Sequence, residues 1–184
     1  MPYLQGPAVN APFGLQPVQM TEGPAQTMAY TVSTSFGSAI LPGDAVVMTS
    51  SAGFIILYTS GATPVGVAAE SIPASLSSAR KCLVYMDPDQ AFVIQQSTAS
   101  AAAGVGGVIG ITTTSTQVLT TPIRSRMQSG VVAPVFGNAA VSTGALRVMA
   151  VHPIELIDGS TGIPASTKLI VKFNLHAYGN QLTT

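Results

Sequence analysis

Residues 84–96 read VYMDPDQAFVIQQ, with two aspartates one proline apart between apolar runs. The side chains before and after this break alternate as they do in β-strands. Asp87-Pro88-Asp89-Gln90 matches a type I turn, with Asp at the first position and Pro at the second. The Asp87 carboxylate can accept a hydrogen bond from a backbone N–H two residues on. We therefore predict the bend of a hairpin here, and no metal or acid–base site.

Strand-like segments rich in Val, Ile, Thr, Tyr and Phe recur from Met28 to Tyr178, separated by clusters of Gly, Pro, Ser and Asp. Short runs spaced by about ten residues are typical of barrels and sandwiches. No helical period is sustained over three turns. We predict an all-β fold, a small β-barrel or sandwich with an extended Pro-rich N-terminal arm.

The last of these segments, KLIVKFNLHAYG at 168–179, is expected to be integral to the barrel. A half-buried strand alternates apolar and polar side chains between its two faces. One face would carry Leu169, Val171, Phe173 and Leu175, and the other Lys168, Ile170, Lys172, Asn174 and His176.

Residues 1–27 have a different character, because a proline recurs about every five residues and proline does not support helices or central strands. We interpret 1–27 as an extended arm and 28–184 as the β-barrel domain. Six apolar side chains of the arm are expected to contact a neighbouring subunit or another surface: Tyr3, Leu4, Val9, Phe13, Leu15 and Val18.

The charge of the chain limits its partners. The 184 residues include seven acidic and seven basic side chains, and only 8% of residues are charged. Zero net charge removes the driving force for binding nucleic acid or anionic membranes. A weakly charged surface also does little to keep copies apart, which favours a protein that works in an assembly. We expect no nucleic-acid partner and no membrane partner.

The chain offers few groups for catalysis. His152 and His176 stand far from other metal-ligand residues in the sequence, and the single cysteine, Cys82, lies in an apolar alternation that suggests a buried position. GVGGVIG at 104–110 lacks the lysine and the following helix of a phosphate-binding loop. We therefore expect no catalytic, cofactor-binding or metal-binding residues, and no enzyme activity.

Six stretches occur in a characteristic order over about residues 40–180, and they include a Gly-Asp entering a strand, a return strand and an Asp-Pro turn. The stretches are LPGDAVV (41–47), TPVGVAAE (63–70), VYMDPDQAFVIQQ (84–96), GVGGVIGI (104–111), LRVMAVHP (146–153) and KLIVKFNLHAYGN (168–180). Taken together, they resemble the head-decoration or cement proteins of tailed bacteriophages.

This resemblance implies a structural virion protein, assembled in the host cytoplasm and placed on the capsid exterior. Such a protein would form homotrimers, bridge adjacent major capsid proteins and stabilise the mature head. The apolar side chains of the arm would then contact the capsid or a neighbouring subunit. The alternatives are a tail or baseplate component and a carbohydrate-binding β-domain. The sequence has no Trp and only 6% aromatic residues, which disfavours a glycan-binding surface.

Overall fold

The fold is described from a computed structural model of the chain. The structure describes residues 14–18, 25–33, 37–49, 53–59, 61–74, 76–96, 100–101, 106–113, 127–130, 145–152, 162–163, 167–174 and 176–178.

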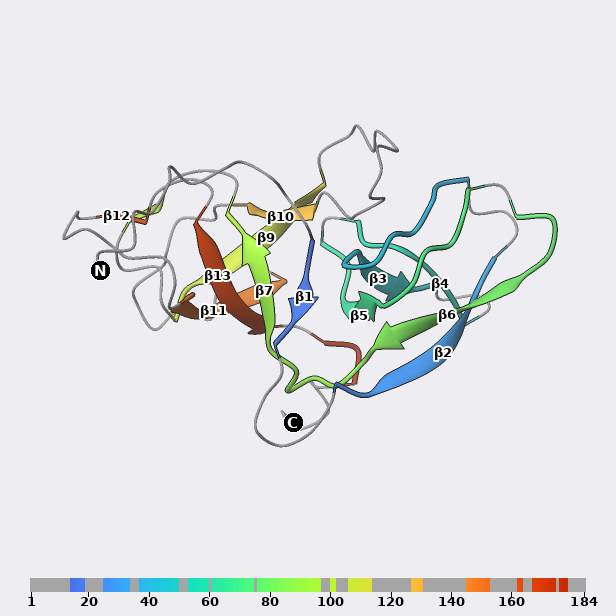
Figure 1. Cartoon of the computed structure of the whole chain (residues 1–184), viewed down its shortest axis with the longest axis horizontal. Helices are drawn as coiled ribbons and strands as arrows, with labels where there is room; N and C mark the ends of the chain where they lie inside the picture. The colour runs from blue at the N-terminus through green and yellow to red at the C-terminus, as the bar shows by residue number, and fades with distance from the viewer. Residues whose placement is uncertain are drawn as a thin grey trace, which may run out of the picture.

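Every regular element within these ranges is a β-strand, which confirms the all-β prediction (Figure 1). The strands are β1 Gln16–Pro17, β2 Thr27–Val32, β3 Ala45–Met48, β4 Phe54–Leu57, β5 Pro64–Ala68, β6 Arg80–Tyr85, β7 Phe92–Gln95, β8 Ser100–Ala101, β9 Val108–Thr113, β10 Met127–Gly130, β11 Leu146–Val151, β12 Gly162–Ile163 and β13 Lys168–Phe173.

Five consecutive strands close a small barrel in the order β2-β4-β3-β5-β6, on the right in Figure 1. Burial along its strands differs: β6 turns Cys82 and Val84 inward and exposes Leu83, whereas all five residues of β5 are buried. The interior is a separate apolar cluster, which the barrel fills with small and β-branched side chains suited to a narrow lumen. Its fully buried members include Val32, Ile40, Val46, Ile55, Val65, Cys82 and Val84.

Six of the other strands form a sheet in the order β1-β7-β13-β11-β9-β10. β8 and β12 pair separately. Within the sheet, β13 alternates half-buried and buried residues along its whole length. This confirms the prediction for Leu169, Val171 and Phe173, which are the buried set, whereas Leu175 lies outside the described residues. The expectation that this segment belongs to the barrel is wrong, because β13 pairs with β7 and β11 in the six-stranded sheet.

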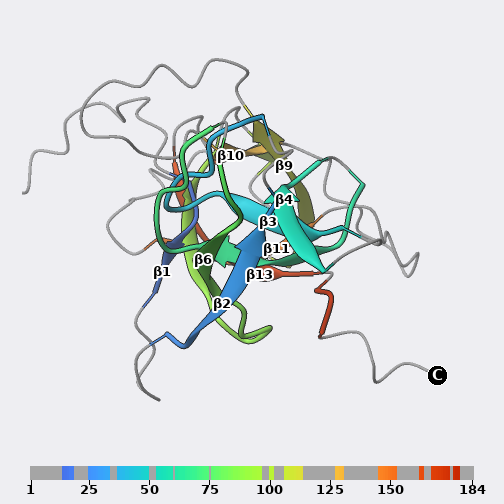
Figure 2. The same ribbon diagram turned by 90° about the vertical axis from the view of Figure 1, so that its right-hand side faces the viewer.

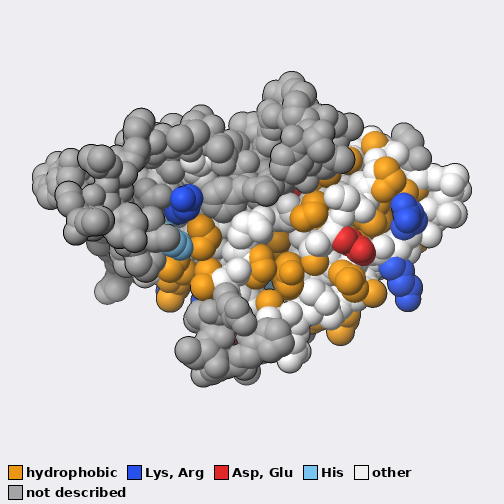
Figure 3. All heavy atoms as spheres, viewed as in Figure 1, with side chains coloured by type: hydrophobic (Ala, Val, Ile, Leu, Met, Phe, Trp, Pro, Cys, Tyr) orange, Lys and Arg blue, Asp and Glu red, His pale blue; other side chains and the backbone are white. Residues whose placement is uncertain are grey.

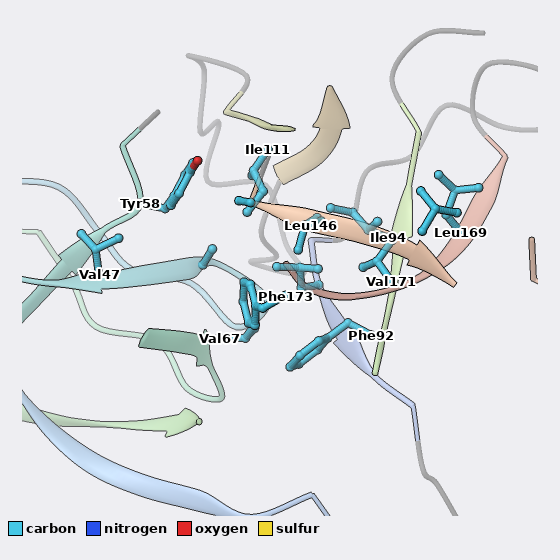
Figure 4. Close-up of a cluster of buried hydrophobic side chains, with 14 residues drawn as sticks. Val47, Tyr58, Val67, Phe92, Ile94, Ile111, Leu146, Leu169, Val171 and Phe173 are labelled. Atoms are coloured by element: carbon cyan, nitrogen blue, oxygen red, sulfur yellow. The ribbon is translucent and has the colours of Figure 1, made fainter. Parts of the chain in front are cut away.

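A second apolar cluster lies between the barrel and the sheet (Figure 4). The barrel contributes side chains from its outer surface, including Val47 and Val67. The sheet contributes Phe92 and Phe173, whose rings meet edge to face with centroids 5.6 Å apart. The two parts of the molecule therefore share one core in addition to the barrel's own.

The Asp87 turn is present, but it does not form a hairpin. The Asp89 N–H donates to Asp87 Oδ1 over 2.9 Å, and the Gln90 N–H donates to the Asp87 carbonyl over 3.1 Å. β6, before the turn, pairs with β2 and β5, whereas β7, after it, pairs with β1 and β13. The turn therefore connects the barrel to the sheet. Its local hydrogen bonds fix a bend in the chain but do not determine with which strands β6 and β7 pair.

The described part of the predicted arm is built into the fold. β1 pairs with β7 at the edge of the six-stranded sheet, where a proline is tolerated. Leu15 is completely buried in the shared cluster, and its N–H donates to the Gly43 carbonyl over 2.8 Å. The prediction that 28–184 forms a separate barrel domain therefore needs amendment, since residues before 28 complete its sheet.

Gly43, whose carbonyl accepts this hydrogen bond, lies in a tight turn formed by Leu41-Pro42-Gly43-Asp44. The Asp44 N–H donates to the Leu41 carbonyl over 3.0 Å, and Gly43 has φ 92°. Proline followed by a glycine of positive φ is the pattern of a type II turn. The buried Asp44 carboxylate accepts a hydrogen bond from the Leu41 N–H over 2.8 Å, which holds the turn closed.

Candidate functional site

The first half of β2 is an exposed strand segment that lacks a described partner on one side. β2 pairs with β6 along all six of its residues, but it pairs with β4 only at Thr31 and Val32. Thr27, Met28 and Ala29 extend past the start of β4, and all three are exposed. The side chain of Met28 is 51% exposed, the highest value among the large apolar residues that the structure describes as exposed. Figure 2 shows this half of β2 in front of the sheet.

The direction of the backbone groups on this edge follows from β6. The Leu83 carbonyl accepts from the Ala69 N–H over 2.8 Å, and the Leu83 N–H donates to Glu70 Oε1 over 2.7 Å. The N–H and the carbonyl of Leu83 therefore both point away from β2. In an antiparallel pair, the N–H and the carbonyl of its cross-strand partner Ala29 then point away from β6. Thr27, two residues earlier, points the same way. No described strand pairs with Thr27, Met28 or Ala29 on that side.

The charged side chains of β2 and β6 themselves lie at one end of this ribbon, while the Glu70 carboxylate lies beside its middle, where it accepts a hydrogen bond from the Leu83 N–H. Arg80 and Lys81 are exposed at one end, opposite Val32 and Thr31. Asp87 is exposed just beyond the other end. Residues 25–33 carry no charge. Figure 3, drawn from the side that carries β2 and β6, shows mainly apolar and uncharged atoms on the described surface. The ribbon therefore has a basic end and an acidic end, with the half-buried Glu70 carboxylate beside β6 between them.

His176 joins the end of β13 to the barrel and does not face solvent. It is 3% exposed, and its Nδ1 accepts a hydrogen bond from the Tyr178 N–H over 3.1 Å. The next residue, Ala177, donates its N–H to the Pro64 carbonyl over 2.9 Å. Burial lowers the pKa of His176, and the backbone of Val65 and the Asp87 carboxylate oppose that effect. An imidazole that accepts at Nδ1 is neutral, which fits the lowered pKa.

Sequence reasoning placed His176 on the polar face of the last strand, and this is wrong. β13 ends at Phe173 and the chain bends at Asn174, so the alternation of the strand no longer applies at 176. The His176 ring instead packs against Phe173 and Tyr178, with ring centroids 5.6 and 6.0 Å away. Tyr178 in turn shares a 3.2 Å hydrogen bond between hydroxyl groups with Tyr30 of β2.

Cys82 is a buried member of the barrel interior, as predicted. Burial raises the pKa of its thiol to about 12, an effect to which Glu70 and Asp44 contribute. A thiol held protonated is a poor nucleophile and a poor metal ligand. Within the described residues, no group of three or more His, Cys, Asp or Glu side chains could hold a metal ion. The described part of the chain also contains no helix long and apolar enough to cross a membrane.

Of the six predicted contact residues, Tyr3, Leu4, Val9 and Phe13 lie outside the described residues. Leu15 belongs to the chain's own core and is not available to a neighbour.

Val18 is half-buried, and its backbone N–H and carbonyl both form hydrogen bonds within the chain. Its N–H donates to the Ala91 carbonyl over 2.9 Å, and its carbonyl accepts from Gln90 Nε2 over 2.8 Å.

The open edge of β2 was missed by sequence reasoning. The segment containing Met28 was read correctly as a strand, but nothing in a strand pattern says on which side it is paired. The one available signal was the absence of lysine and proline from 25–33, since proteins usually protect exposed strand edges with such residues.

A scan of family models and a search of curated proteins find no match to this chain.

Proposed function

We propose that the protein is a structural component of a tailed-bacteriophage head that binds the outer surface of the capsid and cements adjacent major capsid proteins. The observation that carries this proposal is where the six resembling stretches fall in the fold. The described residues of these stretches build β3, β5, the β6–turn–β7 passage, β9, β11 and β13, together with the Leu41–Asp44 turn. They are the framework of both parts of the molecule.

The chemistry of the described residues supports a binding role. The accessible surface presents the uncharged edge of β2 with exposed Met28, and Leu83 is exposed on the neighbouring strand β6. The one cysteine is buried and protonated. A cementing protein needs no chemical reaction. It stabilises the shell through the free energy of binding two capsid subunits at once, when these subunits are at the right distance from each other. Apolar area buried at such a contact contributes about 25 cal/mol per Å². Homotrimers would multiply this contribution, because several contacts act together once the first one forms.

The test is binding of the purified protein to expanded, undecorated phage capsids, followed by cosedimentation and by heating of the decorated shells. We expect saturable binding and a higher temperature of shell disruption. Unexpanded procapsids are the matched control, since the proposed sites are created by maturation. Absence of binding to every expanded capsid type tested, with a folded protein, would contradict the proposal.

A second comparison tests the predicted contact residues. A chain that begins at Gly14 keeps Leu15 and β1, and therefore keeps every described core contact. It lacks Tyr3, Leu4, Val9 and Phe13. We expect it to fold and to bind capsids more weakly than the full chain. Equal binding by the two chains would remove these four residues from the contact while leaving the proposed function in place.

A further inference from the structure

The open edge of β2 has the groups that a further strand needs. Thr27 and Ala29 each direct an N–H and a carbonyl away from β6, and all three residues of the edge are exposed. Most natural edge strands carry a lysine, a proline or a bulge that prevents further pairing. Residues 25–33 have no charge and no proline, and the β2–β6 register runs without a shift.

We propose that this edge binds the same edge of a second copy of the chain, in an antiparallel β2–β2 pair. In one register, each residue whose backbone N–H and carbonyl point outward from the open edge lies opposite another such residue in the second copy. Thr27 of each copy then lies opposite Ala29 of the other, and each such pair exchanges both of its N–H···O bonds. The two copies are related by a two-fold axis that passes between their Met28 residues. A self-complementary contact of this kind is the commonest form of association between identical chains.

The distribution of charge favours a second copy in this orientation. Arg80 and Lys81 mark one end of the β2–β6 ribbon, and Asp87 marks the other. Glu70 lies near the middle, on the side of β6 away from β2, and favours neither orientation. In the antiparallel pair, the basic end of one copy lies on the side of the acidic end of the other. A parallel arrangement would bring like charges together. The two β6 strands would be three strand spacings apart, roughly 14 Å, so these charges orient the copies at low ionic strength and form no direct ion pairs.

The exposed Met28 side chains fit the centre of this pair. Opposite residues of a non-hydrogen-bonded pair have Cα atoms about 4.5 Å apart, so the two thioethers can pack against each other. Three residues per copy remain a small contact compared with the roughly 1,200 Å² of a stable interface. The pair therefore forms where copies are concentrated. A decorated shell would be such a place, but the contact does not rest on that function.

Disulfide trapping tests the pairing and its register in the free protein. In Met28→Cys, the two introduced thiols face each other within the Cα range that a disulfide spans. In Thr27→Cys, the same residues of two copies are offset along the strands and do not face each other. Leu83→Cys places a thiol at a similarly exposed site on a strand that is paired on both sides. Cys82 is buried in all three variants.

We expect Met28→Cys to form linked dimers under mild oxidation at least about tenfold faster than either control variant. A second change then tests the backbone. Ala29→Pro, added to Met28→Cys, removes an outward N–H that the chain's own ladder does not use, whereas Ala29→Ser keeps it. We expect the proline to slow linking about tenfold and the serine to leave it unchanged. Equal linking rates in the three cysteine variants, or a rate that Ala29→Pro does not alter while the melting temperature is retained, would overturn the proposal.

Discussion

The barrel and the six-stranded sheet are built from the chain in different ways. The barrel uses five consecutive strands, β2 to β6, and encloses a core of its own. The sheet takes β1 from before the barrel and β7, β9, β10, β11 and β13 from after it, and its apolar face is covered by the outside of the barrel. The barrel interior is thus independent of the sheet, whereas the sheet depends on the barrel for part of its core. Damage to the shared cluster should be felt first in the sheet.

The largest effect is expected from Phe92→Ala. Phe92 is fully buried in the shared cluster against Phe173. Truncating a buried Phe lowers the free energy of unfolding by about 3–5 kcal/mol. Hydrogen exchange should accelerate more for the amides of β7 and β13 than for those of β3 and β5. Ile55→Ala, inside the barrel, is the matched control and should give the opposite ranking. Equal acceleration in both parts of the molecule by both variants would remove the distinction.

Leu15→Ala tests whether the sheet needs the segment before the barrel. Leu15 has no exposed surface, so its truncation should lower the free energy of unfolding by about 2–5 kcal/mol in urea titrations. Val18→Ala is the nearby control, and its half-buried side chain should matter less. If Leu15→Ala is neutral, the segment is an accessory to the sheet, and a chain beginning at Met28 should fold as the sequence suggested.

Gly66→Ala tests a close approach between β5 and β6 in the barrel. A Cβ added at Gly66 would lie 2.2 Å from the Tyr85 carbonyl oxygen and 2.7 Å from Val84 Cγ1. The first of these is backbone and cannot turn aside, so β5 and β6 would have to separate. We expect destabilisation of about 1–3 kcal/mol, seen as a lower melting temperature. Gly37→Ala is the control, because nothing lies within 4 Å of the added carbon there. Similar melting temperatures for the two variants would show that the barrel yields at this point.

Much of this comparison could not be predicted from the sequence. Alternation identified the buried faces of β6 and β13, and turn chemistry identified the Asp87 bend. These features depend on residues close together in the chain. The division into barrel and sheet depends on which distant strands pair, and VYMDPDQAFVIQQ looks the same whether its two strands pair with each other or with separate partners. Leu15 was misplaced for a related reason: a Pro-rich segment has no period, so nothing local distinguishes a buried leucine from an exposed one.

The His176 link between the sheet and the barrel should make stability depend on pH. Burial lowers the pKa of His176 in the folded protein, so the unfolded chain binds more protons below about pH 6.5. The free energy of unfolding should therefore be highest above that pH and fall as the pH decreases through it. His176→Asn retains an acceptor for the Tyr178 N–H and does not titrate, so it should flatten this part of the profile. A profile that stays the same in His176→Asn would assign the pH dependence to other groups.

The smallest effect is expected at the turn that connects the two parts. The Asp87 side chain acts there as a hydrogen-bond acceptor for the Asp89 N–H, and an asparagine oxygen can do the same. Asp89 also lies 3.4 Å from Lys172 of β13, but its side chain is 91% exposed, and exposed ion pairs contribute little to stability. Asp87→Asn and Asp89→Asn together should change the free energy of unfolding by no more than about 0.5 kcal/mol, and should leave capsid binding nearly intact. Asp87→Ala, which removes the acceptor, should lower the free energy of unfolding by about 1 kcal/mol more.

If the double asparagine variant is as unstable as Asp87→Ala, the negative charge itself holds the barrel and the sheet together at this turn. If it is stable but no longer binds capsids, the two carboxylates are part of the binding surface, and the interpretation of this stretch as only a turn is wrong.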